Sequence, residues 1–287
     1  MEDFGVCYKK RCPEKDDNTI SVRRFSGFNL FSKNVVHIDN ESEADYEWLD
    51  YRYGGHGTNN LTEQPLFIKQ RCRQVVLEDL TGFDNTGNVC LWPSEEVLAS
   101  YVLKHKEQFD GKAVCELGAG MTALAGIFLA SSANPCKVLL TDGNEDCVEN
   151  MEAIICQNKP LFGSTVVSSK RLLWDVNSDL SSLESQFDFI ISADCLFFTQ
   201  CHTGLLHVME TLLKDNGSII IMAPQRKDTL KLFCTKAPSQ FSVVNIENYD
   251  SVMWSRHQAA KKEDPMYDED IHYPVLLLLS KKHKNSL

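Results

Sequence analysis

From residue 112 to the C-terminus, short apolar runs alternate with segments whose apolar residues recur at helical spacing. The runs at 113–117, 137–141, 187–193 and 218–222 are almost continuously apolar. Such runs are typical of strands that are buried on both faces of a parallel sheet. Repeated strand–helix units of this kind predict an α/β fold with a doubly wound, Rossmann-like sheet.

The segments between these strands predict the connecting helices. One is expected at 123–131, a second from Glu145 onward, and a third at 204–213. Asn216-Gly217 is expected to end the third helix, because Gly and Asn are common just beyond a helix C-terminus. Further strands are predicted at 165–173, 241–246 and 273–280.

Another helix is predicted directly after Trp92. Ser94 is a suitable N-cap, and Glu95 and Glu96 would then lie in the first turn, where negative charge is favourable. Trp92 itself is either a core residue or a cover for a ligand.

The N-terminal part of the chain has a different pattern. Residues 33–64 are acidic with few aliphatic side chains, so they predict a loop insertion, and 66–68 is expected to pair with 75–77 as a small hairpin. The aromatic segment 21–32 is expected to pack on the main domain, with a docking surface as the alternative. We therefore expect an N-terminal extension at 1–88 and a main domain at 89–287.

The turn after the strand at 113–117 is the first candidate ligand site. Gly118 and Gly120 allow a sharp turn and a close approach of backbone to ligand, and Thr122 can cap the next helix. A strand, a Gly-x-Gly turn and a helix in this order form the nucleotide-binding corner of a doubly wound sheet. With Ala123 the spacing also fits a dinucleotide pattern, so a nicotinamide enzyme and a turn without ligand remain open.

Acidic residue Glu116 favours S-adenosylmethionine (SAM) over a dinucleotide. Glu116 precedes Gly118 by two residues. A carboxylate there would repel a pyrophosphate and attract the cationic methionine end of SAM.

The carboxyl ends of the other predicted strands carry polar and aromatic residues. Asp142 follows the glycines at the distance where an acid can bind ribose hydroxyls, although it could also cap a helix. Trp174-Asp175 offers a flat face for an adenine, or else forms a surface turn. Asp194 ends the strand at 187–193.

Composition narrows the class of protein. The net charge of −11 disfavours a general nucleic-acid binder. We expect no signal peptide, because residues 1–17 lack an apolar core, and no membrane span, because no apolar run is long enough. The 11 cysteines are scattered without a C-x-x-C pair, which favours free thiols in a reducing compartment and no metal site. We expect a monomer in the cytoplasm, with the nucleus as a second location.

Taken together, these residues resemble the seven-β-strand, SAM-dependent protein methyltransferases. The resemblance rests on Glu116–Gly120, Asp142, Trp174, and Asp194–Phe197, which matches the D-x-x-(Y/F) motif of that family. It implies a seven-stranded sheet with an antiparallel last strand at 273–280. The implied SAM contacts are Trp92, Glu116, Gly118, Ala119, Gly120, Asp142, Trp174 and Ala193.

Longer segments resemble the calmodulin-lysine methyltransferase branch of this family. They are 21–25, 28–31, 83–90, 92–99, 140–145 and 247–250. The resemblance implies calmodulin as protein substrate and trimethylation of one lysine. A methyltransferase for another protein or for RNA, and a non-catalytic member of the fold, are the alternatives.

The implied chemistry assigns two residues to catalysis. Asp194 would dock and orient the lysine amine, and Phe197 would hold its cationic forms by cation–π contact. Because calmodulin is acidic, docking would need a local basic patch, for which Arg23, Arg24 and 69–73 are the candidates.

Overall fold

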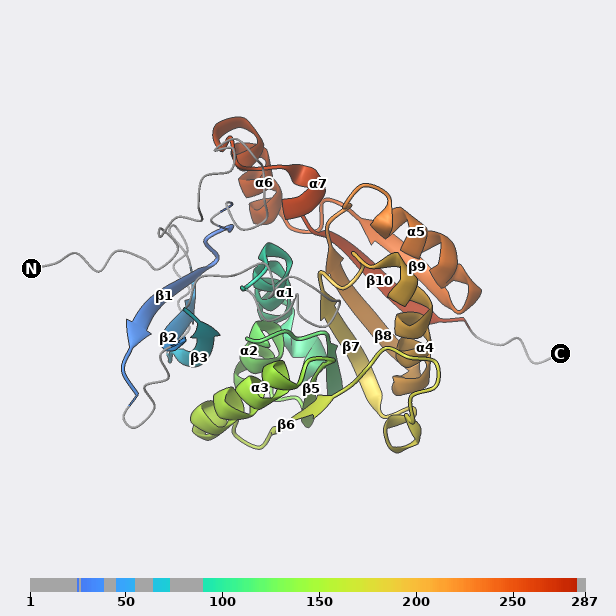
Figure 1. Ribbon diagram of the computed structural model, residues 1–287, viewed down its shortest axis with the longest axis horizontal. Coiled ribbons are helices and arrows are strands. Elements are labelled where there is room, and N and C mark those ends of the chain that lie inside the picture. Colours follow the sequence, from blue (N-terminus) through green and yellow to red (C-terminus); the bar gives the residue numbers. More distant parts are fainter. Residues whose placement is uncertain (1–24, 26, 39–44, 55–63, 73–89, 283–287) are drawn as a thin grey trace, which may run out of the picture.

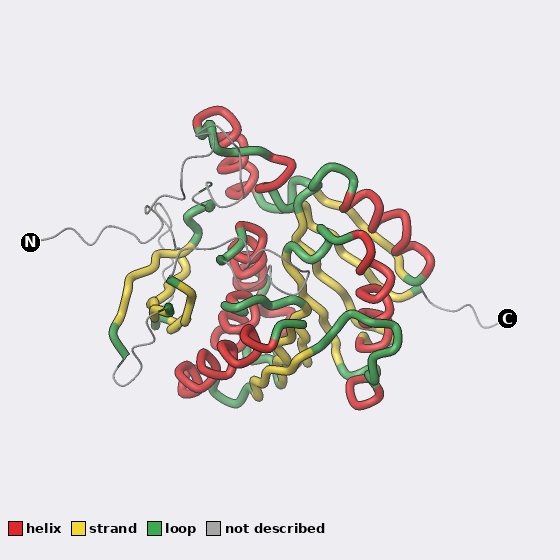
Figure 2. Tube along the Cα trace, in the orientation of Figure 1, coloured by secondary structure: helices red, strands yellow, loops and turns green. Residues whose placement is uncertain are grey.

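The computed structural model describes residues 25, 27–38, 45–54, 64–72 and 90–282. Within them the chain forms a seven-stranded sheet and a separate three-stranded sheet (Figure 1). Helices cover both faces of the large sheet, as the red and yellow segments of Figure 2 show. No helix in this part of the chain is long and apolar enough to cross a membrane.

The large sheet has the strand order β6-β5-β4-β7-β8-β10-β9. Its strands are β4 (Ala113–Leu117), β5 (Lys137–Asp142), β6 (Val166–Arg171), β7 (Phe187–Ala193), β8 (Leu213–Ala223), β9 (Phe241–Ile246) and β10 (Val275–Lys281). Strands β4 to β8 pair in parallel, while β10 runs antiparallel to β8 and β9. The predicted mostly parallel, Rossmann-like sheet with an antiparallel last strand is confirmed. The order reverses between β4 and β7, where such sheets leave a crevice for ligands.

Seven α-helices are found in the described residues: α1 (Pro93–Lys104), α2 (Leu124–Ser132), α3 (Glu145–Asn158), α4 (His202–Leu212), α5 (Thr229–Lys236), α6 (Ser251–Glu263) and α7 (Glu269–His272). Short 3₁₀ helices are η4 (Lys106–Phe109), η5 (Lys159–Leu161), η6 (Ser181–Leu183), η7 (Thr199–Cys201) and η8 (Ala237–Ser239). Helices α1 to α3 share one apolar core with the small sheet, and α4 and α5 share another.

The large sheet separates these two cores, because successive side chains of a strand point to opposite faces. On β8, Ile220 and Met222 belong to the core of α1 to α3. Ile219 and Ile221 belong to the core of α4 and α5. The continuous apolar run is therefore explained by burial on both faces.

The small sheet is an antiparallel meander of β1 (Phe31–Val36), β2 (Tyr46–Tyr53) and β3 (Leu66–Arg71). The loop predicted at 33–64 is therefore wrong for the described part. Aromatic residues such as Trp48 and Tyr51 favour strands, and both are buried here. β3 pairs with β2 and lies at the edge of this sheet, and the partner predicted for it, 75–77, lies outside the described residues, so the predicted hairpin stays a prediction.

Two contacts fasten the small sheet to the main domain. The side-chain amide of Asn158, at the end of α3, donates to the Phe67 carbonyl at 2.6 Å and accepts from the Phe67 N–H at 2.8 Å. The rings of Phe31 and Phe128 lie 4.8 Å apart. This sheet is thus part of the same packed body as α2 and α3.

The described part of the aromatic N-terminal segment packs on the main domain, as expected. Phe25 and Phe28 are buried, with ring centroids 5.0 and 6.2 Å from that of Tyr267. The buried carboxylate of Glu96 accepts hydrogen bonds from the N–H groups of Phe28 and Leu30. The boundary predicted between residues 88 and 89 lies at the edge of the undescribed stretch 73–89 and stays a prediction.

Helix ends were predicted less well than helices. Trp92, not Ser94, is the N-cap residue of α1, and no side chain caps that end. Asn216-Gly217 lies inside β8 and does not end α4, which stops at Leu212. Helix α2 begins at Leu124 after Ala123, so Thr122 is not its N-cap.

Candidate active site

A cavity of about 240 Å³ lies at the carboxyl ends of β4, β5 and β7, beside the loop after β8. Eight of the ten predicted site residues line it: Trp92, Gly118, Gly120, Asp142, Trp174, Ala193, Asp194 and Phe197. Its volume is close to the lower end of the usual range for small-molecule sites, about 300–1,000 Å³. The position is the switch point of the sheet, where the sequence pattern predicts a ligand.

The glycine turn forms one wall of this cavity. Gly118 and Gly120 both have positive φ, at 67° and 62°. A Cβ on Gly118 would lie 2.5 Å from the Sγ of Cys195 and 3.0 Å from the Trp174 ring, so only glycine fits there. The turn and the two side chains against it are therefore packed as one unit.

Asp142 holds the turn from the end of β5. One carboxylate oxygen accepts from the Gly120 N–H at 2.9 Å, and the other accepts from the Asn144 N–H at 2.9 Å. A carboxylate oxygen can accept more than one hydrogen bond, so Asp142 retains the capacity to bind hydroxyl groups in the cavity. Both readings of Asp142, a local structural role and a ligand contact, are compatible with this geometry.

Glu116 and Ala119 do not line the cavity. The Glu116 carboxylate is buried and accepts from the Gly126 N–H of α2 at 2.8 Å, behind the turn. Burial raises its pKa well above the ordinary value for a glutamate. The backbone N–H of Ala119 donates to the Thr141 carbonyl. These two residues shape the turn from behind.

Glu95 is a lining residue that the sequence pattern predicts only as an acid in the first turn of a helix. One carboxylate oxygen accepts from the Thr122 hydroxyl and from the Leu124 N–H, both at 2.7 Å, so Glu95 of α1 caps α2. Burial raises its pKa to about 7. Besides Asp142, the cavity thus presents Glu95 near the glycine turn, where Glu116 was expected.

Asp194 and Arg226 form a bidentate ion pair at the other side of the cavity. Arg226 Nε lies 2.9 Å from one Asp194 oxygen and Nη2 lies 2.6 Å from the other. The guanidinium carbon is 6.0 Å from the ring centroid of Trp92 and 5.9 Å from that of Phe197. Burial would lower the pKa of Arg226, but the Asp194 carboxylate outweighs this and raises it. Nothing in the sequence pattern identified Arg226.

Cys195 lies beside this pair but is not suited to nucleophilic chemistry. Its thiol donates to the carbonyls of Ala193 and Leu117 at 3.2 and 3.5 Å. Burial raises its pKa, so the thiol stays protonated. The remaining lining residues are Gly143, Leu172 and Leu173.

A family model described as "Lysine methyltransferase" matches residues 75–240, more than half of the chain. The chain belongs to this family. It is therefore a SAM-dependent protein-lysine methyltransferase, and the alternatives of a nicotinamide oxidoreductase and a non-catalytic protein are set aside.

Three curated relatives are also named as methyltransferases, two of them for lysine and one for arginine. The calmodulin-lysine N-methyltransferase of Arabidopsis thaliana is 34% identical over 93% of this chain and 90% of its own length. The protein N-lysine methyltransferase METTL21A of Danio rerio is 30% identical over 56% of this chain and 71% of its own length. The histone-arginine methyltransferase METTL23 of Mus musculus is 33% identical over 45% of this chain and 49% of its own length.

The cavity residues fit SAM chemically. Asp142 can accept from ribose hydroxyls, and the Trp174 indole can stack on an adenine. The acidic side chains of Glu95, Asp142 and Asp194 line the cavity, which suits a cofactor that carries a sulfonium and an ammonium. SAM supplies an electrophilic methyl group when bound.

Proposed function

We propose that this enzyme methylates a lysine of calmodulin. The observation that carries the proposal is the extent of the likeness to the Arabidopsis enzyme, which covers 93% of this chain. That coverage must include most of β1 to β3 and the region after residue 240, both outside the family model. METTL21A, whose name states protein lysine methylation without a substrate, and METTL23, whose name states histone-arginine methylation, match only 56% and 45% of the chain.

The site residues divide into two proposed groups. Trp92, Gly118, Gly120, Asp142, Trp174 and Ala193 would hold SAM, with Glu116 and Ala119 supporting the turn. Asp194 would orient the lysine amine, and Phe197 would contact its cationic forms. Because the leaving group of methyl transfer is already good, the main work of the protein is alignment of the amine and exclusion of water.

Trimethylation is the proposed extent of the reaction. Each added methyl removes an N–H donor from the amine, so hydrogen bonds alone would hold later intermediates less well. The rings of Trp92 and Phe197 already flank a cation, the Arg226 guanidinium, at about 6 Å. Cation–π contact does not require N–H donors, so such rings can hold an ammonium at every stage of methylation.

The basic patch expected at 69–73 needs revision. Lys69 is only 7% exposed, and its Nζ lies 5.1 Å above the Tyr46 ring. Arg71 lies over the same ring at 5.8 Å. Arg23, Arg24 and Arg73 lie outside the described residues, so a docking role stays a proposal for Arg23 and Arg24. We further propose that the enzyme is a monomer of the cytoplasm and nucleus. Its substrate would be a protein and not a nucleic acid.

The test is methyl transfer from methyl-labelled SAM to purified calmodulin. We expect label in calmodulin, loss of label when one particular lysine is replaced by arginine, and less label with the Asp142→Ala enzyme when SAM is limiting. Label in another protein of a cell lysate, with none in calmodulin, would refute the substrate and leave the methyltransferase activity intact.

A further inference from the structure

Arg226 is the only cationic residue among the described residues that line the cavity, where Glu95, Asp142 and Asp194 are acidic. Its guanidinium donates hydrogen bonds to both carboxylate oxygens of Asp194, the residue proposed to orient the substrate amine. The Arg226 side chain is 21% exposed and that of Asp194 is 8% exposed, so the pair is largely shielded from water. The charge of Arg226 therefore acts strongly on whatever occupies the cavity.

The backbone is arranged to place Arg226 in this position. Arg226 and Lys227 both have positive φ, at 43° and 60°, a conformation that costs free energy for residues other than glycine. The Arg226 N–H donates to the Asp270 carbonyl at 2.7 Å, and the Lys227 N–H donates to the Asp270 carboxylate at 2.8 Å. Helix α7 thus holds the loop after β8 in place.

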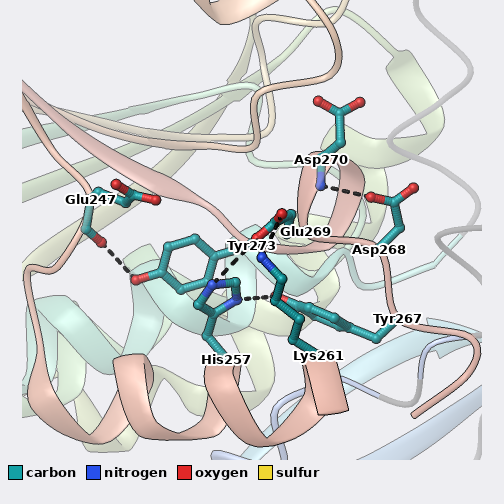
Figure 3. A network of polar contacts seen from close by, with 8 residues as sticks. All are labelled: Glu247, His257, Lys261, Tyr267, Asp268, Glu269, Asp270 and Tyr273. Atoms are coloured by element: carbon teal, nitrogen blue, oxygen red, sulfur yellow. Dashed lines mark hydrogen bonds and ion pairs between the residues drawn. The ribbon is translucent and has the colours of Figure 1, made fainter. Parts of the chain in front are cut away.

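Helix α7 is itself fixed by a polar network (Figure 3). The Asp268 carboxylate accepts from the Asp270 N–H at 2.9 Å, which caps α7. Lys261 of α6 contacts the Glu269 carboxylate at 2.6 Å. His257 contacts the Tyr267 hydroxyl at 2.6 Å. The loop that carries Arg226 is therefore supported by two helices.

A carboxylate beside the reactive amine creates a chemical difficulty. A lysine must lose its proton before it can attack a methyl group, and its ordinary pKa is about 10.4. A nearby unpaired carboxylate would favour the charged ammonium and raise that pKa further. Asp194 alone would thus hold the substrate in its unreactive form.

We propose that Arg226 is a positioning residue for methyl transfer, which neutralises Asp194 so that the carboxylate can hold the substrate amine in its uncharged form. The second lone pair of each Asp194 oxygen remains able to accept an N–H of the amine. The amine releases its proton to water before it binds or while it binds. This inference rests on the proposed role of Asp194 and adds a residue to it.

Other charged groups face the pair and bear on its pH dependence. Asp270 lies against Arg226 from α7, Glu95 faces the cavity from α1, and Asp142 faces it from β5. All three are acidic and favour an ammonium in the cavity. Removal of Arg226 therefore leaves the described lining residues without a cationic side chain.

The test is the pH dependence of kcat for Arg226→Met and Arg226→Lys on a protein that the wild type methylates. In the methionine variant the acidic limb of the kcat profile should shift to higher pH. A shift of one pH unit should lower kcat at neutral pH about tenfold. Activity should recover at alkaline pH. The lysine variant keeps the charge and should keep the wild-type limb, and SAM affinity by calorimetry should not fall in either variant.

Two results would overturn the inference. An equal loss at every pH would show a merely structural role, and a faster methionine variant would show that Arg226 blocks Asp194. The double variant Asp194→Asn with Arg226→Met removes both charges and covers the case in which the single methionine variant fails to fold. Because both charges are gone, its acidic limb should lie near that of the wild type, and a limb as high as that of Arg226→Met alone would count against the proposal. Failure of the wild type on calmodulin would refute only the substrate, since any accepted protein serves for the pH profile.

Discussion

Gly118 shows how tightly the residues around the glycine turn are packed. An added Cβ would meet Cys195 Sγ at 2.5 Å and the Trp174 ring at 3.0 Å, whereas a Cβ on Gly111 would meet nothing within 4 Å. Both glycines have nearly the same positive φ, 67° and 66°. A substitution at Gly111 therefore tests backbone strain alone, whereas the same substitution at Gly118 adds steric crowding.

We expect Gly118→Ala to destabilise the fold by about 1–3 kcal/mol more than Gly111→Ala, because only the former overpacks the core. It should also abolish measurable SAM binding, since the Trp174 ring has to move. Chemical denaturation and calorimetry give the two quantities. Equal losses of stability in the two variants would show that backbone strain, and not steric crowding, causes the loss.

Asp142→Ala is expected to weaken SAM binding by about 1–3 kcal/mol, because it removes charge-assisted hydrogen bonds to hydroxyl groups. The matched control is Asp175→Ala, since Asp175 lies outside the cavity and accepts from Asn177 in a turn. Calorimetry should find normal affinity in the control. Normal affinity in folded Asp142→Ala would remove Asp142 from the cofactor site.

The cavity-lining residues that could be predicted from the sequence are those at the carboxyl ends of strands, because the parallel sheet brings these ends together. Asp142 and Asp194 directly follow apolar runs, so their positions could be inferred from pattern and spacing. Arg226 reaches Asp194 from 32 residues away through a loop held by α7, which leaves no local pattern. The pattern marks Glu95 only as a helix-end acid, because its burial depends on how α1 packs against α2.

At the scale of elements, α1 and α2 are joined through the carboxylate of Glu95. The pKa of Glu95 is raised to about 7, so the folded state holds a proton that an unfolded glutamate, with a pKa of about 4.3, releases. The stability that the protonated group contributes is complete below the unfolded pKa. It is lost as the pH rises through about 7.

We expect Glu95→Gln to remove this pH dependence, because glutamine can still accept from Thr122 and Leu124 without ionising. Between about pH 5 and pH 8, the free energy of unfolding of the wild type should fall relative to that of the variant. Glu145→Gln, in the exposed first turn of α3, is the matched control and should follow the wild type. Parallel curves for the wild type and Glu95→Gln would contradict the assignment.

The elements predicted best were the strands buried on both faces, since a short, continuous apolar run is stable in water only when both of its faces are covered. The elements missed were β1 and β2, in which polar and partly exposed residues alternate with aromatic residues that belong to the same core as α1 to α3. Helix ends were missed where tertiary partners replaced local caps, as Glu95 does for α2.

At the scale of the whole molecule, charge opposes the proposed encounter. The enzyme carries −11 and calmodulin is acidic, so the two repel at long range. Added salt up to about 0.1 M, where the Debye length is about 10 Å, should therefore raise kcat/KM before higher salt weakens close contacts. A rate that only falls with salt would indicate that a strong basic patch dominates docking.

The most direct test of the account is the intact mass of calmodulin after incubation with SAM and either the wild type or Asp194→Asn. We expect the wild type to add three methyl groups to one lysine. The variant should bind SAM normally and turn over roughly a hundredfold more slowly, the scale of a lost orienting contact. Unmodified calmodulin with the wild type, or normal turnover by a variant that has lost SAM affinity, would contradict the account.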